Sequence, residues 1–247
     1  MAMAVGGNIS NRAGTELSVT PAFDSDSPRP FDFLIGLARY VLQPYELDDE
    51  GLNELISAAA RDWVAGSPDR ENGPSRAMEN EVGGEPALSV WLDTKLRSGW
   101  FNTISKQQVS IGGPVVPSRL GPFGTGAKPT RCIWTGSMFD SGASSWTHMS
   151  ALLRYSTHAR RFEVRPEANL LWIDSFEAFA TATITFGSGH WDIDWNEVAA
   201  KFDGVHMTAA AIMEAPRRHG FGLASWTTES TAWFSDHALA TLPPVRL

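Results

Sequence analysis

The chain has 247 residues, of which 43% are hydrophobic and 19% are charged, a balance typical of a globular protein long enough to bury a sizeable core. Its formal net charge of -8 gives no strong nucleic-acid signal, because phosphate binding relies on clustered lysine and arginine side chains. The single cysteine, Cys132, excludes an internal disulfide and any multi-cysteine metal site.

The first residues of the chain and the lengths of its apolar runs indicate where in the cell the protein is expected. Residues 1–14 lack the basic and apolar regions of a secretory signal, and no apolar run approaches the length of a membrane-spanning helix. We therefore expect a cytoplasmic protein with no membrane partner.

The N-terminal part of the chain has two kinds of segment. Residues 1–30 are rich in Gly, Ser, Thr, Asp and Pro and cannot bury enough apolar surface to order themselves, which predicts a flexible arm. Apolar residues at helical spacing predict helices over residues 31–43, 52–63 and 87–100, the second capped by Asp48 or Asp49. Glycine, proline and charged residues over 66–85 predict a linker between them. The sequence thus indicates a helical region over residues 31–100.

Beyond residue 100 the pattern changes to short strands. We expect strands at 107–111, 131–135, 161–164, 170–173, 204–207 and 224–234, with 161–164 at a sheet edge. Three short helices are also expected. The residues that start or cap them are Ser144 or Ser145, Asp174 or Ser175, and Asp192 or Asp194. The predicted fold class is α+β, a helical N-terminal portion followed by a mixed, mainly antiparallel β-sheet domain with short helices over residues 101–247.

Glu229 is the one isolated carboxylate inside a long strand-like run. Thr, Trp and Phe favour a pleated, half-buried surface, whereas Glu is depleted from such strands. Either the side chain points to solvent, or it faces a cleft where its charge acts on a ligand.

Other kinds of active site have little support in the sequence. The six histidines form no close ligand cluster, so we expect no metal, and His206 in its apolar strand is interpreted as a satisfied core histidine. Cys132 lies in an apolar strand where a thiol is usually inert. Residues 121–126 are glycine-rich but lack the strand-turn-helix context of a dinucleotide-binding loop. These observations leave Glu229 as the candidate catalytic group.

A stacking surface precedes Glu229 in the chain. Trp134, Thr135 and Ser137 are expected at the end of a strand, where the intervening glycine lets a ligand approach the backbone. A carboxylate, an aromatic face and hydroxyls together could stabilise the oxocarbenium-like transition state that forms when a C–N glycosidic bond breaks.

The order of several short motifs resembles that of uncharacterised bacterial and phage proteins whose elements are similar to the ADP-ribosyltransferase fold. The motifs are WTGS at 134–137, the segments at 144–146 and 171–175, DGVHMT at 203–208 and WTTESTAW at 226–233. The likeness covers about residues 107–236. It implies that NAD is the substrate, that Glu229 orients the nicotinamide ribose, and that Trp134 or Ser137 lies beside the nicotinamide.

The resemblance departs from its pattern on the first strand. Such transferases carry an Arg or His there to hold NAD, whereas residues 107–112 offer Gln107, Gln108 and Ser110. Arg119 or Arg131 could substitute from neighbouring positions. The cofactor-binding set implied is therefore Trp134, Thr135, Ser137, Ser110 and Arg131, with Glu229 catalytic.

Three functions stay open on this sequence, of which another glycosyl-type hydrolase is the third. In the first, the chain cleaves NAD at the nicotinamide–ribose bond and transfers ADP-ribose to an unknown acceptor, which is a protein side chain, a nucleic-acid base, a small molecule or water. Glu229 then faces a cleft with Trp134, and a Glu229→Gln change leaves stability nearly unchanged. In the second, the same fold is catalytically degenerate and serves binding or a phage-structural role, with Glu229 facing solvent or paired with a local arginine.

Overall fold

The computed structural model describes residues 47–54, 56, 86–111, 120–144, 146–147, 158–187, 192–214, 226, 229–243 and 245–246. The arm predicted at 1–30, the helix predicted at 31–43 and the linker predicted at 66–85 lie outside these residues. So does most of the helix predicted to start at Ser144 or Ser145. Residues 49–54 are helical as predicted, and Asp48 Oδ1 accepts a hydrogen bond from the Gly51 amide at 2.8 Å.

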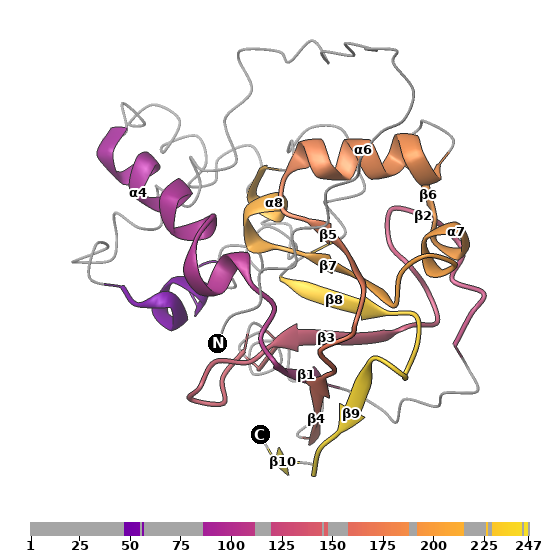
Figure 1. The fold of residues 1–247 in the computed structure, drawn as a ribbon. Helices are drawn as coiled ribbons and strands as arrows, with labels where there is room; N and C mark the ends of the chain where they lie inside the picture. Colours follow the sequence, from indigo (N-terminus) through magenta and orange to yellow (C-terminus); the bar gives the residue numbers. More distant parts are fainter. Residues whose placement is uncertain are drawn as a thin grey trace, which may run out of the picture.

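An eight-stranded sheet forms the centre of the described part (Figure 1). Its order is β10-β4-β1-β3-β8-β7-β5, and β9 pairs with β4 as well. The strands are β1 (Gln107–Ile111), β3 (Ile133–Ser137), β4 (His158–Val164), β5 (Leu170–Ile173), β7 (Gly204–Met207), β8 (Ser230–Trp233), β9 (Leu239–Thr241) and β10 (Val245–Arg246). β5 and β7 are parallel, and all the other pairs in this sheet are antiparallel. A second, two-stranded sheet joins β2 (Thr125–Gly126) to β6 (Ile193–Asp194).

Short helices accompany the sheet. They are α4 (Pro86–Leu96), the 3-10 helix η2 (Gly99–Asn102), α6 (Phe176–Phe186), α7 (Trp195–Ala199) and α8 (Ala209–Glu214). Ser175 caps α6 by accepting a hydrogen bond from the Ala178 amide, and Asp194 caps α7 by accepting one from the Asn196 amide. Both capping residues are among those the sequence predicted, and the α+β class with a mainly antiparallel sheet is confirmed.

The two faces of the sheet differ in chemistry. Alternate residues of β5, β7 and β8, among them Ile173, Val205 and Ala232, face α6 and pack against Phe179 and Phe186 in the main apolar core. Figure 1 shows α6 running beside the β5 and β7 end of the sheet. Because side chains alternate along a strand, the residues in between point to the opposite face. That opposite face carries the polar side chains described below.

Two expectations about strands are wrong in detail. The segment predicted as an edge strand at 161–164 belongs to β4, which has β1 on one side and β9 and β10 on the other. Its alternation arises because Phe162 is buried while Arg161 and Glu163 on either side are partly exposed, and a strand inside a sheet shows the same pattern when its two faces differ. Glu229, which was expected inside a strand, lies in a bend directly before β8. The WTGS motif forms the last four residues of β3, as expected for the end of a strand. No helix of the described residues has the length and apolar character needed to cross a membrane.

Candidate functional site

Glu229 is buried at the junction of β3 and β8, with 3% of its surface exposed. The register that pairs Thr135 with Thr231 places Ser137 opposite Glu229 when it is continued by two residues. Ser137 Oγ donates to Glu229 Oε1 at 2.8 Å, and the Ser137 amide donates to Oε2 at 3.1 Å. The carboxylate is therefore held by two donors of one residue on the neighbouring strand.

Gln108 connects this pair to β1. It stands opposite Ser137 in the register, and its Nε2 donates to Ser137 Oγ at 2.9 Å and to the Ser105 carbonyl at 3.0 Å. Its Oε1 accepts from Thr135 Oγ1 at 2.9 Å, and Thr135 Oγ1 in turn accepts from Trp233 Nε1 at 2.8 Å. Thr135, Gln108 and Ser137 each accept one hydrogen bond of this chain and donate the next.

The chain of bonds has a direction that ends at the carboxylate. It starts at the Trp233 indole N–H, passes through Thr135, Gln108 and Ser137, and donates to Glu229. All five side chains are buried. A buried carboxylate is costly unless it accepts hydrogen bonds, and these donors supply them. We refer to these five residues as the Glu229 network.

His206 lies beside the Glu229 network on β7. Its Nδ1 is 2.8 Å from Thr231 Oγ1 and 3.7 Å from Glu229 Oε1. Burial lowers the pKa of His206 to about 3, so the ring is neutral near pH 7 and forms no ion pair with Glu229. Trp172 on β5 lies against the ring in a tilted contact, with centroids 4.4 Å apart.

The interpretation of His206 as a satisfied core histidine is right about burial and about Nδ1, but it does not hold for the other ring nitrogen. Its Nε2 is buried and has no hydrogen-bond partner in the described part of the chain. The register of β7 with β8 brings the His206 side chain next to Thr231, and no local sequence pattern contains this register. The spacing of histidines along the chain carries no such information.

Trp134 faces away from Glu229. It packs against the core on the α6 side of the sheet, where its ring lies 4.9 Å from that of Trp226 in a T-shaped contact. Lys128 Nζ sits 4.7 Å from the Trp134 ring centroid, and burial lowers the pKa of this lysine. The structure therefore brings Thr135 and Ser137 into the Glu229 network but places Trp134 on the other face. Alternation along β3 is the physical reason.

Ser110 and Arg131 lie further from the carboxylate along their strands. Ser110 is on β1, two residues after Gln108 and so on the same side, where it is half-buried and opposite Arg160 in the register. Arg131 is exposed in the turn before β3, with φ of 52°, at the end of that strand opposite to Ser137. Arg119 lies outside the described residues.

Neither a metal nor a thiol features in the described site. Among the residues that the structure describes, no group of three His, Cys, Asp or Glu side chains is placed to hold a metal ion. Burial raises the pKa of Cys132 to about 12, so its thiol stays protonated at neutral pH.

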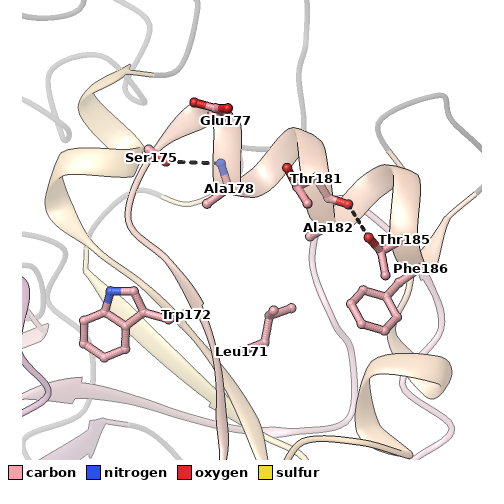
Figure 2. A pocket seen from close by; sticks show the side chains of 9 residues that line it. All are labelled: Leu171, Trp172, Ser175, Glu177, Ala178, Thr181, Ala182, Thr185 and Phe186. Carbon is pink, nitrogen blue, oxygen red and sulfur yellow. Dashed lines mark hydrogen bonds between the residues drawn. The ribbon is translucent and has the colours of Figure 1, made fainter. Parts of the chain in front are cut away.

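A pocket of about 310 Å³ lies between β5 and α6 (Figure 2). Leu171, Trp172 and Phe186 form apolar walls, and Ser175 and Glu177 contribute polar groups. None of the site residues predicted from the sequence lines it. Trp172 borders this pocket and also contacts the His206 ring.

Comparison with protein-family models finds no match for this chain, and comparisons with curated proteins and with solved structures find none either.

Proposed function

We propose that this chain is an ADP-ribosyltransferase that cleaves NAD at the nicotinamide–ribose bond and transfers ADP-ribose to an acceptor. The observation that carries the proposal is the Ser137–Glu229 pair, a buried carboxylate fixed by two hydrogen bonds from the adjacent strand. The sequence resemblance implies a role for both residues in this chemistry.

The chemistry of the pair suits the breaking of a C–N glycosidic bond. When that bond breaks, its electron pair leaves with nicotinamide, whose ring becomes neutral, and positive charge develops on the ribose carbon. A carboxylate that accepts a hydrogen bond from a ribose hydroxyl offsets this charge. The acceptor then adds a lone pair to the ribose carbon and loses a proton. Fixing the carboxylate in advance lowers the cost of reorganising it in the transition state.

Gln108 favours a second candidate function. It occupies the first strand, where the ADP-ribosyltransferases that the sequence resembles have an Arg or His, and its uncharged amide is committed to Ser137 and Ser105. A buried amide offers no positive charge to the phosphates of NAD. The alternative is therefore a catalytically degenerate protein on the same fold that binds a partner, and the two functions differ in whether NAD is bound and consumed.

NAD consumption by the purified protein separates the two functions. The rate is measured for wild type, for Glu229→Gln and for Glu197→Gln, a control change of the same kind at an exposed position on α7, with and without a cell lysate as acceptor source. The proposal expects turnover by wild type and the control, and loss of it in Glu229→Gln. Absence of turnover in all three, with no shift of the melting temperature by NAD, would support the degenerate alternative. A cytoplasmic location remains part of the proposal.

A further inference from the structure

β5 is the last strand at one end of the described sheet and pairs with β7 on its inner side. A strand in this position presents backbone N–H and C=O groups to its outer side. The Ile173 carbonyl accepts from the Thr208 amide at 3.0 Å, so the backbone groups of Ile173 point toward β7. Because these groups alternate in direction along a strand, those of Leu170 and Trp172 point outward. Within the described part of the chain, no backbone hydrogen bond occupies them.

The 310 Å³ pocket lies at this outer edge of β5. Leu171 and Trp172 are consecutive in the strand, so their side chains lie on opposite faces of the sheet. Leu171 packs into the main apolar core with α6, whereas Trp172 contacts His206 on the other face. Both side chains nevertheless line the same pocket. A pocket that reaches both faces of one strand lies along the edge of that strand, here between β5 and α6 (Figure 2).

One side of α6 forms the opposite wall of the pocket. Two rows of residues spaced four apart line it, an apolar row of Ala178, Ala182 and Phe186 and a polar row of Glu177, Thr181 and Thr185. Glu177 is exposed and is the only charged residue among the described residues that line the pocket. None of the ion pairs in the described part of the chain involves it. The wall is therefore apolar at its base and acidic at its rim.

We propose that the groove between β5 and α6 binds an extended segment of a partner protein, which adds to the sheet as a strand beside β5. The segment places one apolar side chain in the pocket and a lysine or arginine beside Glu177. In this mode of recognition, main-chain hydrogen bonds give affinity and pockets for alternate side chains give specificity.

Three observations select this occupant. The outward backbone groups of Leu170 and Trp172 need partners that another strand supplies. A volume of about 310 Å³ is at the lower end of the range for small-molecule pockets, about 300–1,000 Å³, and suits a single large side chain. The carboxylate of Glu177 and the net charge of -8 favour a basic segment. No member of the Glu229 network lines the pocket, so the proposal does not depend on NAD chemistry.

The probe is a fluorescein-labelled peptide of about six residues, the usual length of a strand, in which valine and lysine alternate. Its affinity for the full-length protein is measured by fluorescence anisotropy. Two derivatives carry N-methyl groups, one on every valine and the other on every lysine. Alternate residues of a strand direct their backbone groups to the same side, so only one derivative loses its bonds to β5. We expect that derivative to bind at least about tenfold more weakly than the parent peptide, and the other to stay within about threefold.

Two tryptophan substitutions on α6 test the pocket. Thr181 is exposed and lines the pocket, so Thr181→Trp fills it without changing the core. Ile184 is 70% exposed on the same helix and does not line the pocket, which makes Ile184→Trp the matched control. We expect a loss of affinity of about tenfold or more for Thr181→Trp and a change within about twofold for Ile184→Trp. Thermal unfolding establishes that both variants are folded.

Glu177→Lys tests the preference for a basic segment. Glu197→Lys makes the same change at an exposed position on α7 and controls for the change in net charge. We expect Glu177→Lys to bind the valine–lysine peptide about threefold or more weakly than wild type, and to bind a valine–glutamate peptide more tightly. Equal losses in the two variants would overturn the role of Glu177.

Amide hydrogen exchange followed by NMR locates the added strand. The Trp172 amide points to the outer edge and should exchange at least about tenfold more slowly in the complex. The Ile173 amide points toward β7 and is the internal reference.

Failure of folded wild type to bind the valine–lysine peptide, or an equal loss for the two methylated derivatives, would overturn the proposal. If sedimentation shows a dimer for wild type and a monomer for Thr181→Trp, the occupant is a second copy of this chain and the partner segment is overturned. All of these measurements are made without NAD, so none of them changes the standing of the proposed function.

Discussion

Ser137 and Glu229 are 92 residues apart in the chain, yet the Ser137 hydroxyl donates to Glu229 Oε1 at 2.8 Å. The contact follows from the antiparallel pairing of β3 with β8, which sets these residues opposite each other. It converts an isolated carboxylate near a strand into a fixed, buried acceptor.

Replacing Glu229 by glutamine should destabilise the protein. One carboxylate oxygen becomes an NH2 group, which cannot accept from the Ser137 amide or hydroxyl. We expect a loss of about 1–3 kcal/mol in the free energy of unfolding, measured by urea denaturation. This differs from the near-neutral effect expected from the sequence, because Glu229 is buried. Glu197→Gln, at an exposed position, should stay within about 0.5 kcal/mol of wild type.

Ser137 and Glu229 should be energetically coupled. Ser137→Ala removes a donor to Glu229 and an acceptor for Gln108, so each single change should cost about 1–3 kcal/mol. The double variant should lose clearly less than the sum of the two, with an interaction energy of about 0.5–3 kcal/mol. Additive losses in urea denaturation would mean that the bond contributes nothing. Ser141→Ala, at an exposed turn serine, should combine additively with Glu229→Gln.

Stability should fall at acid pH because of His206. Its pKa is about 3 in the folded protein, whereas the ordinary value of about 6.5 applies to the unfolded chain. Between these values the unfolded chain binds a proton that the folded protein does not. Protonation of His206 therefore has no effect on stability above about pH 6.5. Below it, the free energy of unfolding decreases by about 1.4 kcal/mol per pH unit as the pH falls toward 3.

The His206→Asn variant is the control for this pH dependence, since asparagine does not titrate. Its unfolding free energy should depend less steeply on pH between about 6 and 4 than that of wild type. Parallel curves for the two proteins would show that His206 is not the group responsible.

Gly136 should not tolerate a side chain. A Cβ at this position would lie 2.4 Å from Trp146 Cδ1, and Trp146 Nε1 donates to Ser230 Oγ at 3.1 Å. We expect Gly136→Ala to cost about 1–3 kcal/mol, from overpacking of this contact. In a Trp146→Ala background the same change should cost much less, because the indole is gone. If thermal unfolding shows the same loss of stability in both backgrounds, the contact with Trp146 is not its cause.

Local sequence patterns were sufficient for the fold class and for most element positions. Alternating or continuous apolar runs located β1, β5 and β7 within a residue or so, and Ser175 and Asp194 were found as helix caps. The sequence patterns do not predict α8, because its short run of alanines has no amphipathic pattern, although Thr208 directly before it accepts a hydrogen bond from the Ala211 amide.

The composition of the site depended on pairing that no local pattern contains. Glu229 and Ser137 were singled out by residue type, but their contact is set by the register of β3 with β8. Trp134 was assigned to the same site because it adjoins Ser137 in the sequence, and strand alternation places it on the opposite face. The register of β7 with β8 also explains why the sequence does not assign His206 to the site, since its partner Thr231 lies on another strand.

The most direct test of the central claim is the initial rate of nicotinamide release from NAD, compared between wild type and Glu229→Gln at a temperature where both are shown to be folded. We predict release by wild type and a rate at least about 100-fold lower in the variant, as expected when a group that stabilises transition-state charge is removed. Equal rates in the two proteins, or no release by folded wild type in the presence of a lysate, would contradict the claim.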